Sequence, residues 1–238
     1  MKKKSAIITG ASKGIGREVA KHLSLQGYDL LLISRTEALL TELAKEINAT
    51  SNKTVIETAA IDVFDFNEVN KVVTNFYEKT GTIDLLFNNA GYAKRGTSEI
   101  DLTELSLMIN SNLIGAINLI KAVTPLMKIN NSGYIINVSS RSAQTPRSFL
   151  GGYAATKAAL LAFNEALYKE MKDTKIKVTA LCPGFVDTEM TMDVKEDRNK
   201  LIKTSDICSA IDFLLSLSPA VALKTLSFES TVQVGGYC

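Results

Sequence analysis

Histidine, cysteine and tryptophan are scarce in this chain of 238 residues, which has one histidine, three cysteines and no tryptophan. The lone His22 lies in an expected amphipathic helix, where a solvated helix face is the simplest interpretation. A histidine-dependent hydrolase or a histidine-rich metal centre is therefore not expected. Cys182, Cys208 and Cys238 are widely spaced and form no C-x-x-C pair, which argues against a disulfide framework and a zinc site. We expect no bound metal and a reducing, cytoplasmic location.

Charge of one sign and long apolar runs are also lacking. The net charge of +2 is too small to indicate a polyanion-binding surface, so we expect no nucleic-acid partner. The apolar stretch 6–8 after the lysines at 2–4 is too short for a signal peptide, and no segment approaches the run needed to span a membrane. Only four prolines are present, and there is no repeat or Pro/Gly-rich linker, so we expect one domain over 1–238.

What the chain does have is a regular alternation of short apolar runs and helical patterns. Strands are expected at 5–9, 29–34, 54–61, 83–88, 133–138, 177–182 and 231–234. Helices are expected near 15–27, 36–49, 66–79, 102–129, 153–172 and 204–216. Continuously apolar runs such as Leu30-Leu31-Leu32-Ile33 are typical of strands buried on both faces. The alternation predicts an α/β fold with three layers, in which helices cover both faces of a doubly wound, mostly parallel, seven-stranded sheet.

The segment 186–203 is an exception, because it is polar, contains methionine and is only weakly periodic. It follows the end of an expected strand. One interpretation is a solvated connector, and the other is a mobile substrate lid. Open α/β sheets bind ligands at the carboxyl ends of their strands, and this favours the lid.

A glycine-rich turn, TGASKGIG at 9–16, joins the first expected strand to the first helix. Glycines at the bends let backbone N–H groups approach an anion, and the helix N-terminus adds about half a positive charge. The spacing G-x-x-x-G-x-G differs from the commonest dinucleotide pattern and lacks the G-K-[ST] ending of a nucleotide-triphosphate loop. Such glycines could merely build a tight turn, but their position after the first strand favours a dinucleotide site.

The end of the second expected strand indicates which nicotinamide cofactor is bound. A carboxylate there would accept hydrogen bonds from the ribose 2′-hydroxyl of NAD. The sequence instead has Arg35, and Asp29 lies at the opposite end of that strand. Arg35 can pair with a 2′-phosphate, with Lys13 of the glycine turn close enough to assist. We therefore predict that NADP(H) is preferred over NAD(H).

Tyr153 and Lys157 lie four residues apart, on one face of an expected helix. The helix follows a buried strand that ends at Ser139-Ser140. A phenol with a pKa of about 10 is a poor acid at neutral pH. A lysine ammonium roughly 4 Å away contributes about 4 kcal/mol at an effective dielectric constant of about 20, enough to bring the phenol pKa near 7. Tyr153, Lys157 and Ser140 are therefore the expected proton-transfer centre.

With these features together, the chain resembles the short-chain dehydrogenase/reductase family, in its compact, single-domain, NADP-preferring branch. The motifs occur in the family's order over nearly the whole chain. They are TGASKGIG at 9–16, Asp62-Val63, Asn88-Asn89-Ala90-Gly91, Asn112, Ser140, Tyr153-x-x-x-Lys157, and Pro183-Gly184 with Thr188. The resemblance implies a Rossmann fold and an oxidoreductase acting on carbonyl or alcohol groups.

The resemblance also assigns cofactor-binding roles to residues of this chain. The pyrophosphate turn would be formed by Gly10, Ser12, Gly14, Ile15 and Gly16. The adenine would meet Asp62, with Val63 packing nearby, and the cofactor channel would be lined by Asn89, Ala90 and Gly91. The nicotinamide amide would be cradled by the segment from Pro183 to Thr188, which includes Gly184 and Val186. Plain strand-end turns are the alternative for the asparagines at 88–89.

The same resemblance assigns the catalytic roles. Tyr153 would protonate the substrate oxygen and also contact the cofactor, Ser140 would hold that oxygen, and Lys157 would also bind the ribose hydroxyls. Asn112 would kink its long helix and anchor a water in a proton relay, the alternative being a helix N-cap. The helices 102–129 and 153–172 carry small and apolar residues of the kind that pack across a two-fold axis in this family, so a homodimer or homotetramer is expected, although a purely intrachain core role is the alternative.

The expected function is reduction of a ketone or aldehyde by NADPH, or oxidation of the matching alcohol. A 3-oxoacyl-thioester reductase is the first alternative, because Arg141 and Arg147 could meet an acidic carrier or substrate. An NADP(H)-sensing binding protein without catalysis is an alternative of another class, and the intact Ser140, Tyr153 and Lys157 argue against it. The C-terminus 226–238 departs from the D-G-G ending of many family members, which leaves the substrate class and any oligomer contact of the last strand open.

Overall fold

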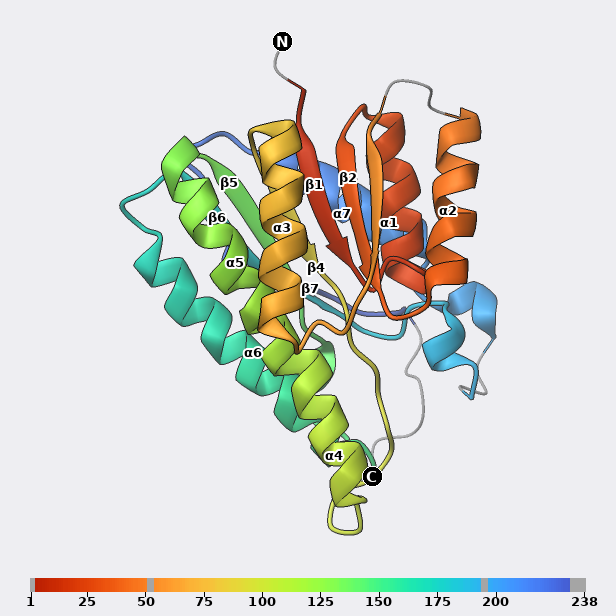
Figure 1. The fold of residues 1–238 in the computed structure, drawn as a ribbon. Coiled ribbons are helices and arrows are strands. Elements are labelled where there is room, and N and C mark those ends of the chain that lie inside the picture. The colour runs from red at the N-terminus through yellow and green to blue at the C-terminus, as the bar shows by residue number, and fades with distance from the viewer. Residues whose placement is uncertain (1–2, 51–53, 194–196, 232–238) are drawn as a thin grey trace.

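The computed structural model describes residues 3–50, 54–193 and 197–231. Their strands form one seven-stranded sheet in the order β3-β2-β1-β4-β5-β6-β7, and every neighbouring pair is parallel (Figure 1). The strands are β1 Ser5–Thr9, β2 Asp29–Ser34, β3 Ile56–Ala60, β4 Leu85–Asn88, β5 Gly133–Val138, β6 Ile176–Pro183 and β7 Thr225–Phe228. The predicted doubly wound α/β fold is confirmed.

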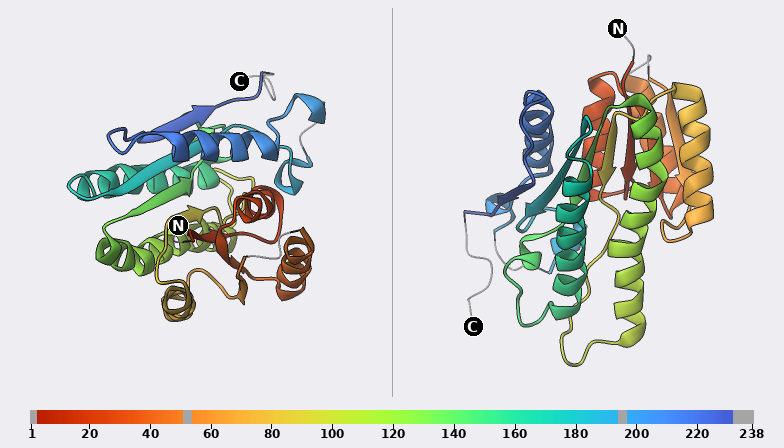
Figure 2. Two further views of the ribbon diagram at one scale, coloured as in Figure 1. Left: turned by 90° about the horizontal axis from the view of Figure 1, so that it is seen from above. Right: turned by 90° about the vertical axis from the view of Figure 1, so that its left-hand side faces the viewer.

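Two helix layers cover the sheet. The helices are α1 Gly14–Leu25, α2 Glu37–Thr50, α3 Phe66–Thr80, α4 Leu102–Ile109, α5 Gly115–Asn130, α6 Gly151–Glu170 and α7 Thr204–Ser216. One apolar core packs α1, α2 and α7 against one face of the sheet, and a second packs α3, α5 and α6 against the other. Figure 2 shows the two layers on opposite sides of the strands.

The continuously apolar strands build both cores. Along β1, Ile8 enters the core beneath α1 while Ile7 enters the core beneath α3 and α5, and both are fully buried. Successive side chains of a strand point to opposite faces, so a strand between two helix layers needs apolar residues at every position. The strand order reverses between β1 and β4, and a ligand site is expected at the carboxyl ends of these strands.

The longest helical run is continuous from α4 through a π-helical turn, Asn110–Ile114, into α5. By composition this run, Leu102–Asn130, is long and apolar enough to cross a membrane, and half of its most apolar window is buried. The expectation that no segment approaches such a run is therefore wrong. The apolar residues are explained by packing, because Leu119, Val123 and Met127 are fully buried in the core beneath α5.

Two further expectations differ from the structure. The seventh strand is Thr225–Phe228, where Leu226 and Phe228 pack against the core, whereas most of the expected strand at 231–234 lies outside the described residues. His22 is not a solvated residue of a helix face. Its Nε2 lies 2.9 Å from Asp212 Oδ1, and its side chain is 27% exposed, because α1 and α7 pack against each other.

Candidate active site

The glycine-rich turn leads from β1 into α1 and has a backbone that only glycine adopts easily. Gly10 and Gly14 have φ angles of 63° and 52°. A Cβ added at Gly16 would lie 2.3 Å from the carbonyl oxygen of Gly10, so the turn and the helix pack too closely for any side chain. The turn is also tied to β2, because the Ala11 N–H donates to the Ile33 carbonyl at 3.2 Å.

This turn fits the pyrophosphate of a dinucleotide. Lys13 is the N-cap of α1 and makes no side-chain capping hydrogen bond, and the first helical turn contains no acidic residue. The positive end of the helix dipole therefore faces the glycine turn without a neutralising carboxylate from its own first turn. Ser12 and Ile15, which the sequence analysis also expected at the pyrophosphate, are half-buried beside the three glycines.

The two basic residues expected at the 2′-phosphate lie in different surroundings. Arg35 is exposed directly after β2. Burial and Glu104 raise the pKa of Tyr92, and the positive charge of Arg35 opposes this rise only in part. Lys13 does not extend freely toward Arg35, because its Nζ lies 2.7 Å from Glu189 Oε2. Lys13 is therefore engaged by an acidic residue that the sequence analysis did not consider.

Asp62 and Val63 lie in the loop between β3 and α3. Val63 is buried, and a Cβ added at Gly115 would lie 2.3 Å from Val63 Cγ2. The Asn118 side chain donates to the Val63 carbonyl at 3.1 Å. Gly115 and Asn118 thus hold this loop on the first turn of α5, and neither was recognised from the sequence, because their contacts are with a segment more than 50 residues away.

The segment from Asn88 to Gly91 connects the glycine turn to α6, the helix that carries Tyr153 and Lys157. The backbone N–H groups of Asn89 and Ala90 both donate to Thr9 Oγ1 at 2.9 Å, and Asn89 Nδ2 donates to the Thr9 carbonyl at 3.1 Å. A Cβ added at Gly91 would lie 2.6 Å from Asn112 Oδ1 and 3.5 Å from Lys157 Nζ. Gly91 therefore lies directly against two of the candidate catalytic residues.

A chain of buried amides runs beneath this segment. Asn88 Nδ2 donates to Asn137 Oδ1 at 3.1 Å, Asn137 Nδ2 donates to Asn164 Oδ1 at 2.9 Å, and Asn164 Nδ2 donates to the Lys224 carbonyl at 3.3 Å. All three asparagines are at most 3% exposed. Fully paired buried amides fix one relative position of β4, β5 and α6. The sequence analysis missed Asn137 and Asn164, whose pairing depends on the strand order.

Ser140, Tyr153 and Lys157 come together at the carboxyl end of β5. Ser140 follows β5 and is 9% exposed, and Tyr153 and Lys157 lie in the first two turns of α6. Lys157 Nζ is 5.9 Å from the centre of the Tyr153 ring and donates to the Val138 carbonyl at 2.9 Å. Lys157 is 4% exposed, so its side chain is buried. Tyr153 and Lys157, four residues apart in the sequence, therefore lie side by side in the structure.

The electrostatics of this cluster differ from the expectation. Burial raises the pKa of the Tyr153 phenol, and its hydrogen bond with Ser140 only partly opposes that rise. Burial also lowers the pKa of Lys157 to about 8. The expected phenol pKa near 7 is therefore wrong for this structure. Loss of solvation is the largest influence on the phenol pKa, the Lys157 ammonium is held at the Val138 carbonyl, and the phenol is protonated at neutral pH.

Asn112 lies in the π-helical turn between α4 and α5 and is fully buried. Its Oδ1 accepts from the Tyr92 N–H at 2.9 Å, and its Nδ2 donates to the Tyr92 carbonyl at 2.9 Å and to Thr156 Oγ1 at 3.0 Å. π-Helical turns interrupt the regular ladder and are frequent at functional sites. The side chain of Asn112 thus joins the loop after β4 to α6, one residue before Lys157.

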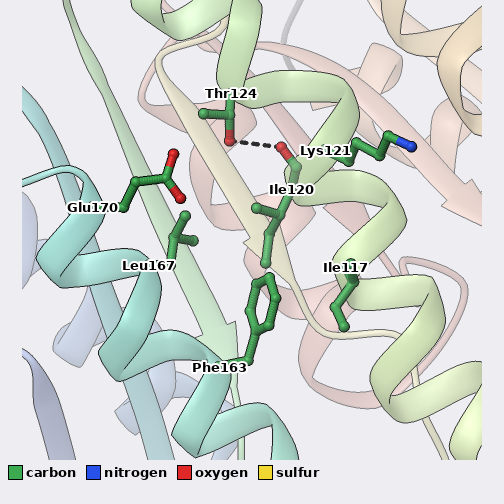
Figure 3. Close-up of a pocket in the computed structure, with 7 residues that line it drawn as sticks. All are labelled: Ile117, Ile120, Lys121, Thr124, Phe163, Leu167 and Glu170. Atoms are coloured by element: carbon green, nitrogen blue, oxygen red, sulfur yellow. Dashed lines mark hydrogen bonds between the residues drawn. The ribbon is translucent and has the colours of Figure 1, made fainter.

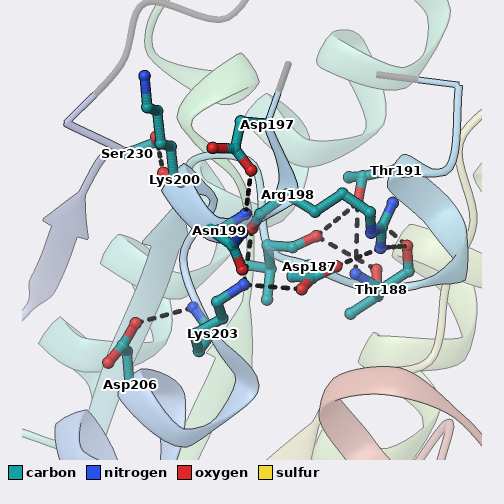
Figure 4. Close-up of polar contacts among 11 residues, drawn as sticks. Asp187, Thr188, Thr191, Asp197, Arg198, Asn199, Lys200, Lys203, Asp206 and Ser230 are labelled. Atoms are coloured by element: carbon teal, nitrogen blue, oxygen red, sulfur yellow. Dashed lines mark hydrogen bonds and ion pairs between the residues drawn. The ribbon is translucent and has the colours of Figure 1, made fainter. Parts of the chain in front are cut away.

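The segment from Pro183 to Thr188 leaves the end of β6 beside the glycine turn. The Gly184 N–H donates to the Phe228 carbonyl at 2.9 Å, and Val186 pairs with Ile202 in a parallel bridge. A Cβ added at Gly14 would lie 3.2 Å from Thr188 Cγ2. The segment 186–203 therefore starts in contact with the glycine turn, and its polar contacts are drawn in Figure 4.

Comparisons with known proteins agree with this architecture. The family described as short chain dehydrogenase matches residues 4–199. An uncharacterized oxidoreductase of Staphylococcus saprophyticus is 38% identical over 215 residues, covering 89% of this chain and 91% of that protein. An NADP-dependent 3-hydroxy acid dehydrogenase of Schizosaccharomyces pombe is 33% identical over 243 residues, covering 95% and 93%.

A solved structure extends the similarity to the whole fold. The crystal structure of a β-ketoacyl-[ACP] reductase from Bacteroides thetaiotaomicron has a TM-score of 0.84 and 32% sequence identity, covering 97% of this chain and 98% of that chain. Its fold and the family match agree with the parallel sheet and the glycine turn described above. The chain therefore belongs to the short-chain dehydrogenase family and is an oxidoreductase that uses a nicotinamide cofactor on a small-molecule substrate.

Proposed function

We propose that this enzyme is an NADPH-dependent reductase of a ketone or aldehyde, with Tyr153 as the general acid. The observation that carries the proposal is the cluster of Ser140, Tyr153 and Lys157, in which Ser140 and Lys157 are buried and Lys157 lies beside Gly91. Because burial raises the pKa of Tyr153, the phenol holds its proton at neutral pH, which is the form needed to donate to a carbonyl oxygen.

Each residue of the cluster has a separate task. A bound nicotinamide cofactor supplies the hydride that reduces the carbonyl carbon. The Ser140 hydroxyl is hydrogen-bonded to the phenol and would orient the substrate oxygen beside it. Lys157, held by the Val138 carbonyl, provides a positive charge that stabilises the tyrosinate left after proton transfer. Asn112 fixes the loop at Tyr92 against α6 through Thr156. We also propose that Asn112 anchors a water molecule in a proton relay.

The preference for NADPH rests on Arg35, which is exposed where the sheet edge would meet the adenosine ribose. The similarity to an NADP-dependent 3-hydroxy acid dehydrogenase supports the same assignment. We expect Arg35→Ala to weaken NADPH binding about 10- to 100-fold and NADH binding less than threefold, because only the 2′-phosphate loses a charge-assisted hydrogen bond. Calorimetric titration of both cofactors measures this. Equal losses with both, or the same loss in the exposed-lysine control Lys45→Ala, would contradict the assignment.

The substrate is proposed only as a class. The experiment that tests the proposal follows NADPH absorbance with a panel of ketones, aldehydes and 3-oxoacyl thioesters. Turnover of several carbonyls with NADPH supports the proposal, and no turnover of any member by a protein that binds NADPH opposes it. Activity confined to 3-oxoacyl thioesters would instead establish the second candidate function.

That second candidate, a 3-oxoacyl-thioester reductase, is favoured by the 32% identity to a β-ketoacyl-[ACP] reductase over nearly the whole chain. The two arginines considered for an acidic carrier have partners within this chain. Arg141 donates to Glu229 and to Gln144, both at 2.5 Å. The Arg147 guanidinium lies 4.6 Å from the centre of the Phe185 ring. Neither geometry by itself supports carrier binding, so the candidate depends on the similarity.

We also propose that the chain forms a single domain over 1–238. Within it, we propose that 186–203 acts as a substrate lid. The segment begins against the glycine turn and contains two short 3₁₀ helices, Glu189–Thr191 and Arg198–Lys200. Met190 and Met192 are exposed, which suits a segment that covers an apolar ligand. Its position at the carboxyl ends of the strands supports this interpretation over that of a plain connector.

A homodimer or homotetramer is the proposed assembly. An open groove of about 270 Å³ lies between α5 and α6 on the outer face of the second helix layer (Figure 3). Its lining combines apolar and oppositely charged residues, namely Ile117, Ile120, Lys121, Thr124, Phe163, Leu167 and Glu170. Two copies of such a surface can pair about a two-fold axis, because in an isologous contact the same surface patch of each copy packs against that of the other.

This surface gives a direct test of the assembly. We expect Phe163→Glu to shift the protein toward the monomer in light scattering after gel filtration, because a carboxylate would be buried without a partner. The control is Leu25→Glu, since Leu25 is 70% exposed on α1, in the opposite helix layer. A monomeric wild-type protein, or an unchanged oligomer in Phe163→Glu, would rule out this interface.

The proposed cellular setting is the cytoplasm. Cys182 and Cys208 are free and buried, and burial raises the pKa of both thiols, that of Cys208 to about 12. Thiols in this state are poor nucleophiles and behave as small apolar side chains. They need no oxidising compartment, which supports a reducing one.

A further inference from the structure

An ion pair joins the glycine turn to the segment 186–203. Lys13 Nζ lies 2.7 Å from Glu189 Oε2, and the two side chains are 55% and 61% exposed. Lys13 is the N-cap of α1, and Glu189 is the first residue of a 3₁₀ helix. The pair therefore connects the expected phosphate site to the proposed lid across 176 positions of the sequence.

Contacts within the segment hold Thr188, the residue before Glu189 (Figure 4). The Asp187 carboxylate pairs with both Arg198 and Lys203, which brings the two ends of the segment together. Arg198 also donates to the Thr188 carbonyl at 3.3 Å, and Thr188 contacts Gly14 of the glycine turn. Glu189 is the next residue, and this places its carboxylate within reach of Lys13.

Lys13 is also close to the place proposed for the adenosine 2′-phosphate. The glycine turn is bonded to the end of β2 through the Ala11 N–H and the Ile33 carbonyl, at 3.2 Å. Arg35 lies two residues after Ile33 and directly follows β2. A phosphate monoester carries about −1.5 to −2 charges, whereas a glutamate carries one. A phosphate beside Arg35 is therefore a stronger partner for the Lys13 ammonium than Glu189.

We propose that Glu189 is a cofactor-specificity residue, which competes with the adenosine 2′-phosphate for Lys13 and so lowers the affinity for NADPH without changing that for NADH. The proposal rests on the proposed function, because it assumes a 2′-phosphate site at Arg35 and Lys13. NADPH would break the Lys13–Glu189 pair, whereas NADH would leave the pair intact.

The test is calorimetric titration of the wild type, Glu189→Gln and Asp193→Asn with NADPH, NADH and adenosine 2′,5′-bisphosphate. Asp193 is an exposed acid four residues further along, so its variant removes the same charge from the same segment. We expect Glu189→Gln to bind NADPH and the bisphosphate two- to fivefold more tightly, as suits an exposed ion pair, and NADH within 1.5-fold of the wild type. Asp193→Asn should match the wild type with all three.

A second pair of variants isolates Lys13. In a Lys13→Gln background, adding Glu189→Gln should leave the NADPH affinity unchanged, because no ammonium remains to compete for. Unchanged or weaker NADPH binding by Glu189→Gln, or an equal gain in Asp193→Asn, overturns the competition while the cofactor preference stands. A wild-type protein that binds NADPH no more tightly than NADH instead overturns the proposed cofactor assignment.

Discussion

Replacing Tyr153 by phenylalanine should lower kcat/KM for carbonyl reduction by a factor of about 10³, within the 10² to 10⁴ typical of a general acid. The substitution removes only the hydroxyl group. The ring stays beside Lys157, and every residue of the glycine turn is unchanged. Cofactor affinity should therefore change less than threefold. Stopped-flow measurement of NADPH oxidation under single-turnover conditions would separate the loss in chemistry from any loss in binding.

The matched control for this variant is Tyr168→Phe. Tyr168 lies on the same helix, α6, and its ring is 5.7 Å from Lys224 Nζ rather than in the cluster. We expect Tyr168→Phe to keep the wild-type rate. A Tyr153→Phe enzyme that reduced carbonyls as fast as the wild type would show that another group donates the proton, and the proposed mechanism would fail.

The second large effect is expected from Lys157→Met, in which activity and stability should change in opposite directions at pH 7. Activity should fall by a factor of about 10², because the tyrosinate loses its neighbouring ammonium. Stability should rise, because Lys157 is 4% exposed and its charge is buried without a carboxylate partner among its described contacts. Urea unfolding followed by circular dichroism, together with the rate of NADPH oxidation, measures both changes.

The pH dependence gives the sign of this stability effect. Burial lowers the pKa of Lys157 to about 8 from 10.5, so between these values the unfolded chain binds a proton that the folded protein has lost. The free energy of unfolding of the wild type therefore rises with pH from about 8 to about 10.5, and the burial penalty of about 3 kcal/mol is fully present below pH 8. Lys157→Met has no titrating group at this position, so its free energy of unfolding should not show this rise between pH 8 and 10.5.

The difference in stability between the two proteins should therefore shrink as the pH rises. At pH 7 the methionine variant should be more stable by about 2 kcal/mol, after about 1 kcal/mol is subtracted for the lost hydrogen bond to the Val138 carbonyl. At pH 10 and above this advantage should disappear. Lys172→Met, at an exposed position just after α6, serves as the control and should follow the wild type. A stability difference independent of pH would contradict the buried, charged state of Lys157.

These expectations bear on the direction of the reaction. A protonated Tyr153 and a mostly charged Lys157 suit proton donation near neutral pH, whereas alcohol oxidation needs the tyrosinate. Raising the pH removes the phenol proton but also discharges Lys157 above about pH 8. Reduction should thus be favoured at neutral pH, which agrees with the proposed use of NADPH.

The sequence alone determined the features that depend on near neighbours. Continuously apolar runs such as Leu30–Ile33 specify strands buried on both faces, and the alternation of short apolar runs with helical patterns predicted six of the seven strands close to their positions. The glycine turn at 9–16 and the spacing of Tyr153 and Lys157 were recognisable for the same reason, since one turn or one helix face is set by residues a few positions apart.

Only the tertiary structure decided what each side chain faces. Lys13 pairs with Glu189, and His22 pairs with Asp212, across 176 and 190 positions of the sequence. The direction of the Tyr153 pKa shift depends on how completely α6, β5 and β6 exclude water, which helical spacing does not report. Burial and partner choice come from the packing of distant segments, and no pattern within a single segment contains them.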